Sequence, residues 1–288
     1  MNANSKKVLA CVDGFASTFL VADWAIWSAQ SLRAPLEFLH VVDRHLAQSG
    51  SHDLSGSLGV DAQDALMQEL ATLDEQRTKV ATEHGRRLLD HAKARAATAG
   101  LSLVEARQRH GTLVDTLLDM EPEIRLAILG PHTHNRNASR LSFDHHVESV
   151  VRSLRVPVLV ANRPHETPRS FLLAFDGSRT GQKMVQTVAA SALLQGLDCH
   201  IVTVGESTAQ ASAQADAARA TLSAAGFACT VVIVEGHAEE VLQAYLTQHR
   251  IDLLVMGAYG HSRIRELILG SITTTMLLTS TVPVLILR

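Results

Sequence analysis

The sequence predicts an α/β protein made of two doubly wound, five-stranded, mostly parallel sheets in tandem, related by a pseudo-twofold axis. Three observations support this prediction. The chain has 288 residues, of which 46% are hydrophobic, and this is enough for two buried cores. Its apolar runs are short and do not alternate, which is typical of parallel strands buried on both faces. Its two halves also repeat the same motifs in the same order.

The repeat consists of three matched strands. In each half an apolar strand ending in Asp-Gly comes first, an apolar strand ending in Gly follows later, and a Val-Pro-Val-Leu strand comes last. The matched segments are 8–14 with 171–177, 125–130 with 252–257, and 156–161 with 282–287. Such self-similarity indicates a duplication.

The second half gives the clearest order of elements. Its predicted strands are 171–175, 199–204, 228–234, 253–256 and 283–287, and its predicted helices are 181–194, 210–225, 238–248 and 272–279. Strands that alternate with helices favour parallel pairing with right-handed crossovers.

The first half contains an insertion before Gly100. A Gly/Ser-rich loop over 48–59 leads into a polar-apolar pattern over 61–97, with leucines near helical spacing. We expect a long or broken helix that lies over the first domain. The segment 162–169 has two prolines and marks the boundary, so the predicted domains are 1–163 and 169–288.

Composition excludes several classes of protein. The formal net charge is -3 with both signs interspersed, so neither a nucleic-acid partner nor an anionic membrane is expected. No apolar run is long enough for a signal segment or a membrane-spanning helix. Cys11, Cys199 and Cys229 lie in apolar runs without a CxxC pair, which favours buried thiols in a reducing compartment. We therefore expect a cytoplasmic protein.

A glycine-spaced loop follows the fourth predicted strand of the second half. It has the form G-x2-G-x9-G-S, with Gly257, Gly260, Gly270 and Ser271 at the fixed positions. Glycines allow backbone amides to approach an anion, and the N–H groups at the start of a helix favour negative charge. Ser271 and Thr273 can add hydroxyl donors, and Arg263 or His261 can neutralise phosphate charge. Taken singly, Gly270 and Ser271 fit a turn glycine and a helix cap equally well; their full spacing between a buried strand and a helix favours binding.

With this loop, Asp176 after the first strand and the terminal Val-Pro-Val-Leu strand, residues 169–288 resemble a universal stress protein. The resemblance implies an adenine-nucleotide alpha-hydrolase-like fold, and a site for ATP or AMP with Mg²⁺ as an optional companion. Asp176 is also a common turn residue and helix cap. The complete predicted nucleotide site is Ala174, Asp176, Thr203 or Val204, Gly257, Gly260, His261, Arg263, Gly270, Ser271, Ile272 and Thr273.

The first half departs from this pattern. Thr133 replaces the second glycine, and Phe143-Asp144 or Asp144-His145 replaces Gly-Ser, so an acidic or bulky group would oppose a phosphate. We expect no ATP there. The histidines of the loop are interpreted as surface residues rather than metal ligands: His132, His134, His145 and His146. Trp24 and Trp27, near Leu20, are expected to pack in the core.

The leading hypothesis is a regulatory stress-response protein in which nucleotide occupancy changes a conformation or the binding of an unknown protein partner. The alternatives are a slow ATPase or adenylate-transferring enzyme, and an interaction scaffold with a vestigial nucleotide site. The sequence offers no paired carboxylates or nucleophile with a helper group, so catalytic residues are not assigned and turnover is not favoured. The two Val-Pro-Val-Leu strands predict an intramolecular pseudo-dimer, with a homodimer of two chains as a further arrangement.

Overall fold

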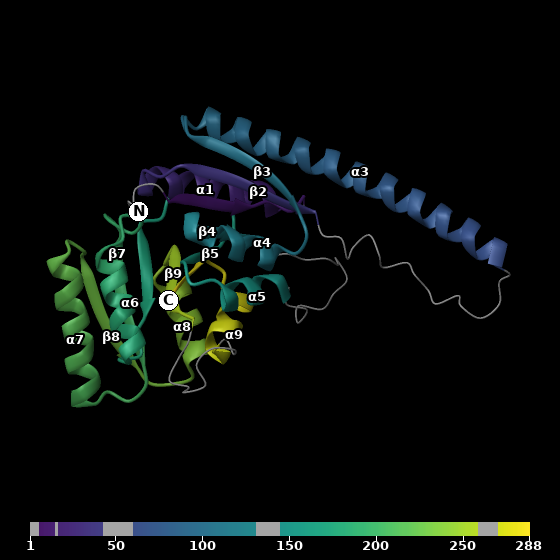
Figure 1. Ribbon diagram of the computed structural model, residues 1–288. Helices are drawn as coiled ribbons and strands as arrows, with labels where there is room; N and C mark the ends of the chain where they lie inside the picture. Colours follow the sequence, from purple (N-terminus) through teal and green to yellow (C-terminus); the bar gives the residue numbers. More distant parts are fainter. Residues whose placement is uncertain (1–5, 15–16, 43–59, 131–144, 259–269) are drawn as a thin grey trace.

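The computed structural model describes residues 6–14, 17–42, 60–130, 145–258 and 270–288, and it describes no side chain at 17, 60–66, 145 or 146. Its described strands form a ten-stranded sheet in the order β3-β2-β1-β4-β5-β10-β9-β6-β7-β8 (Figure 1). The strands are β1 (Lys7–Cys11), β2 (Leu36–Val42), β3 (Val104–His110), β4 (Ile124–Leu129), β5 (Val158–Val160), β6 (Ser170–Ala174), β7 (Asp198–Val204), β8 (Cys229–Val234), β9 (Leu253–Gly257) and β10 (Val284–Leu287).

The sheet contains two equivalent halves that meet at their last strands. Within each half the described strands pair in parallel, in the chain order 3-2-1-4-5. Strands β5 and β10 pair antiparallel, with Leu159 opposite Leu285. The predicted α/β class is therefore confirmed, and the repeated Val-Pro-Val-Leu strands are the segments that join the halves within one chain.

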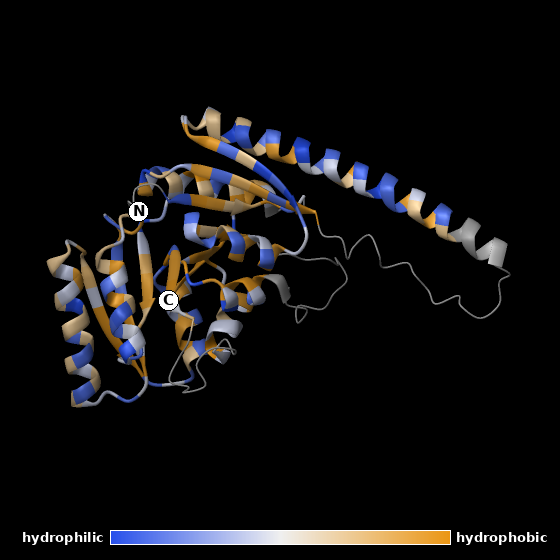
Figure 2. Ribbon diagram, viewed as in Figure 1, coloured by the Kyte–Doolittle hydropathy of each residue, from blue (hydrophilic) through white to orange (hydrophobic). Residues whose placement is uncertain are grey.

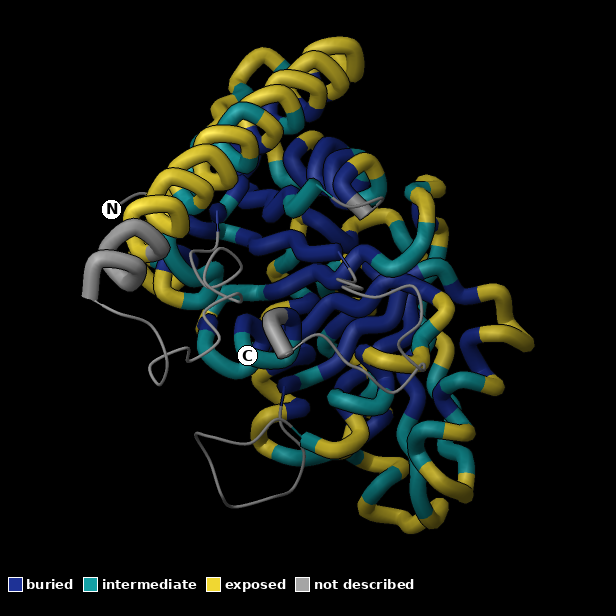
Figure 3. The backbone as a smooth tube through the Cα atoms, turned by 90° about the vertical axis from the view of Figure 1, so that its right-hand side faces the viewer, coloured by how far each residue is buried: buried dark blue, intermediate teal, exposed yellow. Residues whose placement is uncertain are grey.

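Helices cover both faces of the sheet. They are α1 (Ser17–Leu32), α3 (Val60–Thr98), α4 (Leu113–Met120), α5 (His145–Ser153), α6 (Arg179–Ala189), α7 (Ala209–Ala224), α8 (Ala238–Gln248) and α9 (Ser271–Thr279), with a short 3₁₀ helix η2 (Glu121–Glu123). One buried apolar cluster joins the sheet to α1, α3, α6 and α7. A second joins the opposite face to α4, α5, α8 and α9. The inner strands are accordingly apolar and buried along most of their length (Figures 2 and 3), whereas the edge strands β3 and β8 contain no fully buried residue.

The insertion forms one continuous helix, α3, of 39 residues. At 1.5 Å per residue it is about 58 Å long. The strands against which its C-terminal part packs, β2 and β3, have only seven residues each. Among its described side chains, the buried apolar ones are in the C-terminal turns: Leu89, Ala92 and Ala96. Its earlier turns extend beyond the sheet, where Leu73 is 42% exposed and Val80 is 70% exposed (Figures 1 and 3). The expectation that the insertion lies over the domain was thus wrong for its N-terminal part, because the helix is longer than the sheet.

The linker between the halves packs against the two tryptophans. Trp24 is fully buried, and its Nε1 donates to the carbonyl oxygen of Arg163 at 3.0 Å. The ring of His165 lies edge-on to Trp24, with centroids 4.8 Å apart, and 6.1 Å from the ring of Trp27. Trp27 is only partly buried, so the prediction of core packing is correct for Trp24 and only partly so for Trp27. Burial lowers the pKa of His165, which favours its neutral form.

Candidate functional site in the C-terminal half

The carboxyl ends of β6, β7 and β9 meet the N-terminus of α9 at a cavity of about 400 Å³. This is the edge at which open parallel sheets bind ligands, and the volume lies within the ~300–1,000 Å³ of small-molecule sites. The described lining residues are Ala174, Phe175, Asp176, Gly181, Met184, Val202, Val204, Ala238, Leu242, Met256, Gly257, Gly270, Ser271, Ile272 and Thr273. They come from six elements and from the turns that follow them.

Most of the residues proposed from the sequence converge on this cavity. Those that line it are Ala174, Asp176, Val204, Gly257, Gly270, Ser271, Ile272 and Thr273. Gly260, His261 and Arg263 lie outside the described residues. The topology accounts for the convergence, because parallel strands direct their carboxyl ends to one edge of the sheet.

Strand β7 presents Val204 to the cavity and turns Thr203 away from it. Successive side chains of a strand point to opposite faces, and Val202 and Val204 are both lining residues. The Thr203 hydroxyl is buried without a hydrogen-bond partner among the described residues. The structure thus selects Val204 from the two residues that the sequence left as alternatives, and Thr203 does not line the cavity.

The first turn of α9 is open toward the cavity. Gly270 is its N-cap, in an extended conformation, and no side chain caps the helix by a hydrogen bond among the described residues. The side chains of Ser271 and Ile272 are exposed. The first N–H groups of a helix have no partner within the helix, and together with the macrodipole they form a favourable environment for an anion.

Thr273 has a structural role at the same edge. It is buried, with 3% of its surface exposed, and its Oγ1 donates to the carbonyl oxygen of Gly257 at 3.1 Å. The hydroxyl proton is therefore used within the protein. This corrects the expectation that Thr273 supplies a hydroxyl donor to a phosphate: the residue holds the end of β9 against α9 and lines the cavity with its remaining surface.

Asp176 lies at the rim of the cavity and is fixed by the start of α6. Its Oδ1 accepts hydrogen bonds from the backbone N–H and the hydroxyl of Ser178, at 3.0 and 2.7 Å. Ser178 is the N-cap of α6 and accepts from the N–H of Gly181 at 3.0 Å. Asp176 thus lines the cavity and organises the turn before α6, while Ser178 rather than Asp176 caps the helix; the role of Asp176 in binding stays a prediction.

Gly181 is a lining residue that sequence reasoning missed. A Cβ at this position would lie 2.6 Å from Oδ1 of Asp176 and 3.2 Å from the ring of Phe175. The absence of a side chain therefore lets α6 approach the aspartate closely. The signal was present as a glycine in the first turn of a predicted helix, where glycine is otherwise unfavourable.

The floor of the cavity is apolar, and the sequence analysis missed its members. They are Phe175, Met184, Val202, Ala238, Leu242 and Met256. Val202 could have been found, because it stands two positions before Val204 on the same strand face. Met184, Ala238 and Leu242 come from helices whose placement only the folded chain provides.

The cavity thus combines an apolar floor with a polar rim. The floor suits a flat aromatic ring, the open end of α9 suits an anion, and the carboxylate of Asp176 suits hydrogen-bond donors such as sugar hydroxyls or an exocyclic amine. Asp176 is the one acidic residue among the described lining residues. This arrangement can hold a nucleotide, and it brings no second carboxylate to the described part of the cavity.

The corresponding loop of the N-terminal half, residues 131–144, lies outside the described residues, with Thr133, Phe143, Asp144, His132 and His134 among them. In the described ranges no group of three or more His, Cys, Asp or Glu side chains is placed to hold a metal ion. No helix in those ranges is long and apolar enough to cross a membrane.

Comparisons with known proteins agree with the duplicated fold. A family model described as the universal stress protein family matches residues 4–162 and again residues 168–288. A universal stress protein of Synechocystis sp. is 35% identical over 286 residues, which cover 98% of this chain and 100% of the relative.

Two solved structures resemble the chain over nearly its whole length. A universal stress protein from Archaeoglobus fulgidus DSM 4304 superposes with a TM-score of 0.67 at 18% identity, covering 99% of this chain and 98% of the other. A putative universal stress protein from Pseudomonas aeruginosa UCBPP-PA14 gives 0.64 at 17% identity, covering 99% and 95%. At such identities these structures support the fold alone.

Proposed function

This chain belongs to the universal stress protein family, and we propose that its C-terminal half binds an adenine nucleotide, ATP or AMP, as a regulatory ligand. The observation that supports this most is the cavity in which Asp176, Gly257 and Gly270 converge at the open end of α9. A glycine spacing alone also occurs in ordinary turns, but here it meets a cavity of suitable size at the ligand-binding edge of the sheet.

Each part of the nucleotide has a matching part of the cavity. The phosphates lie at the first turn of α9, where Gly270 leaves the backbone N–H groups open and Ser271 adds a hydroxyl. The adenine lies on the apolar floor between Val204 and Leu242, and Asp176 accepts hydrogen bonds from the ribose or the base. Mg²⁺ accompanies ATP through its phosphate oxygens and solvent.

The nucleotide acts as a signal in this proposal. Occupancy changes the conformation around Gly257 and Gly270, and a protein partner distinguishes the occupied from the empty form. We place this function in the cytoplasm. Because Asp176 is the one acidic residue among the described lining residues, we expect binding without efficient hydrolysis, which needs a positioned base or metal carboxylates.

Isothermal titration of ATP and of AMP, with and without Mg²⁺, tests the binding. Gly270→Asp places a carboxylate at the N-terminus of α9 and should weaken the affinity at least about tenfold, or about 1.4 kcal/mol. The control is Ala192→Asp, which adds the same charge at an exposed position in the turn between α6 and β7, where the backbone has no positive φ. The proposal is rejected if wild type binds neither nucleotide, or if both variants bind as wild type does.

Release of inorganic phosphate from ATP is the separate test for an enzyme. We expect no release above background at high protein concentration. Turnover that Ser271→Ala abolishes would replace the regulatory proposal with hydrolysis at the same cavity.

A further inference from the structure

Two of the three cysteines are direct neighbours in the sheet of the C-terminal half. Cys199 on β7 and Cys229 on β8 are register partners in a parallel strand pair, so they are adjacent although thirty positions separate them in the sequence. Both are free thiols. Both belong to the apolar cluster on the α7 face of the sheet, which means that their side chains lie on the same side.

The geometry of this pair is compatible with a disulfide. Adjacent strands lie about 4.7–4.9 Å apart, within the Cα separation of about 4.4–6.8 Å found across disulfides. The Cys229 thiol donates to the carbonyl oxygen of Phe227, at 3.6 Å, a weak bond within its own strand region that does not fix the sulfur away from Cys199. Closing the disulfide therefore needs rotation of two short side chains and little movement of the backbone.

The two thiols differ in their access to solvent. Cys199 is fully buried, whereas Cys229 is partly buried at the start of β8, the last strand of the described sheet. Burial raises the pKa of the Cys199 thiol, and the neighbouring Cys229 raises it further. Cys199 is consequently a poor first nucleophile, while Cys229 can be reached by a small oxidant from the sheet edge.

We propose that Cys199 and Cys229 form a reversible intramolecular disulfide when the protein meets hydrogen peroxide. The Cys229 sulfur attacks one peroxide oxygen, the O–O bond breaks, and Cys229 becomes a sulfenic acid with release of water. The Cys199 sulfur then attacks the Cys229 sulfur, the S–O bond breaks, and the hydroxyl leaves as water with the Cys199 proton. Two thiols lose two electrons and two protons in total, and one peroxide is reduced to two waters.

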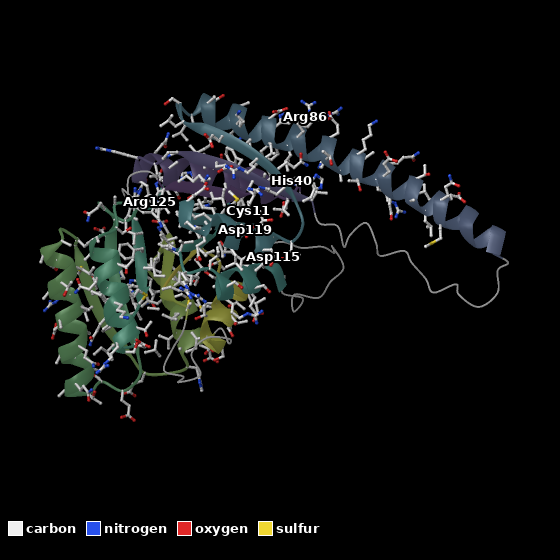
Figure 4. All side chains as sticks on the ribbon, viewed as in Figure 1. Cys11, His40, Arg86, Asp115, Asp119 and Arg125 are labelled. Atoms are coloured by element: carbon white, nitrogen blue, oxygen red, sulfur yellow. The ribbon has the colours of Figure 1, made fainter. Side chains whose placement is uncertain are left out.

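Cys11 serves as an internal control because it shares the burial but lacks the partner. It lies on β1 in the N-terminal half (Figure 4), is 8% exposed, and stands in register with Leu39 rather than with a cysteine. Burial, assisted by the charge of Asp13, raises the pKa of its thiol to about 12. We expect Cys11 to stay reduced under the conditions that oxidise the pair.

This disulfide is independent of the proposed nucleotide site. Cys199 is near the start of β7 and Val204 is at its end, a separation of about 17 Å along the strand. Transient disulfides of cytosolic proteins are characteristic of redox sensing. The cysteine pair thus makes the protein responsive to an oxidant as well as to a nucleotide. It lies at the opposite end of the strands from the cavity.

The test uses the full-length protein. It is reduced, desalted, treated with hydrogen peroxide, and then alkylated with iodoacetamide under denaturing conditions. We expect the number of alkylated cysteines to fall from three to one, leaving only Cys11 labelled. Tryptic digestion without reduction should give one linked pair of peptides, 184–219 with 220–250, that dithiothreitol separates.

Variants assign the order of events. Cys199→Ala should leave a Cys229 sulfenic acid that dimedone traps, and Cys11→Ala should still give the linked peptides. Three alkylated cysteines in oxidised wild type would overturn the proposal, and so would oxidation of Cys11 to the same extent as the pair. The peptide map of wild type decides the matter even if the Cys199→Ala chain fails to fold, and neither result depends on whether the protein binds ATP.

Discussion

The Thr273 hydroxyl donates to the carbonyl oxygen of Gly257 at 3.1 Å, and this hydrogen bond joins the end of β9 to the first turn of α9. Gly257 begins the glycine-spaced motif and Thr273 lies two residues after its end, and both belong to the predicted nucleotide site, yet the bond between them is internal to the protein. It holds the end of β9 against the first turn of α9. The predicted nucleotide site therefore contains a residue with a structural role as well as residues that line the cavity.

We predict that Thr273→Val destabilises the protein by about 1–3 kcal/mol, because it leaves the Gly257 carbonyl without its partner at almost constant side-chain volume. Urea unfolding measures the change. Thr273→Ser keeps the hydroxyl and is the control. A valine variant as stable as wild type would show that the bond makes no net contribution to stability.

Gly181→Ala should separate ligand binding from stability. The new Cβ would lie 2.6 Å from Oδ1 of Asp176, so we expect the carboxylate to turn away while the free energy of unfolding changes by no more than about 1 kcal/mol. Under the proposed function the affinity for ATP should fall. Thr180→Ala, at the exposed neighbouring position of α6, should leave the affinity unchanged; equal effects of the two variants would contradict a role for Asp176.

The docked and projecting parts of α3 should respond differently to substitution. A Cβ on Gly85 would lie 2.2 Å from Cδ2 of His40, a ring that is itself buried, so Gly85→Ala should destabilise the fold by about 1–3 kcal/mol. Leu73→Ala, on a residue that is 42% exposed, should cost less than about 1 kcal/mol. Denaturant unfolding compares them, and a larger loss for Leu73→Ala would mean that the projecting turns are covered in solution.

The stability should fall as the pH drops through the range in which histidine titrates. Burial lowers the pKa of His40 below its ordinary 6.5, although the bond from its Nδ1 to the Val12 carbonyl and the charge of Asp13 act in the opposite direction, and His84 lowers it further. The unfolded state then binds more protons than the folded state below pH 6.5, so the free energy of unfolding decreases as the pH falls toward the folded pKa and changes little above about 7.

Unfolding by urea at about pH 7.5 and about pH 5.5 measures this effect. In the His40→Gln variant the side chain at this position cannot titrate. The free energy of unfolding of the variant should therefore differ less between the two pH values than that of wild type. Burial also lowers the pKa of His165 and His200, so the variant should retain part of the slope. An unchanged slope would show that His40 is not the source of the pH dependence.

The predictability of the fold differed between elements. The strands of the C-terminal half agree with their predicted bounds to within one or two residues, since short apolar runs without alternation are typical of parallel strands buried on both faces. The insertion was recognised as helical from its spacing. That Leu73 and Val80 face solvent was not predictable, because an apolar stripe shows which face could be buried but not whether a partner surface reaches it.

The residues of the candidate site also divide into those that the sequence predicted and those that depend on tertiary packing. Asp176, Gly257 and Gly270 were found from the sequence because they directly follow strands or precede a helix, and parallel strands bring such positions to one edge. Gly181 and Leu242 were missed, since their approach to the cavity depends on how α6 and α8 pack. The choice of Val204 over Thr203 needed the strand register.

By itself the sequence determined that the chain is a duplicated α/β protein with an asymmetric pair of loops, because glycine spacing and apolar strand patterns are local properties of the chain. Only the tertiary structure decided that Thr273 is bonded to Gly257, that α3 extends past the sheet, and that Cys199 lies beside Cys229. These relationships depend on strand register and helix packing, which join residues distant in the sequence and which no local pattern encodes.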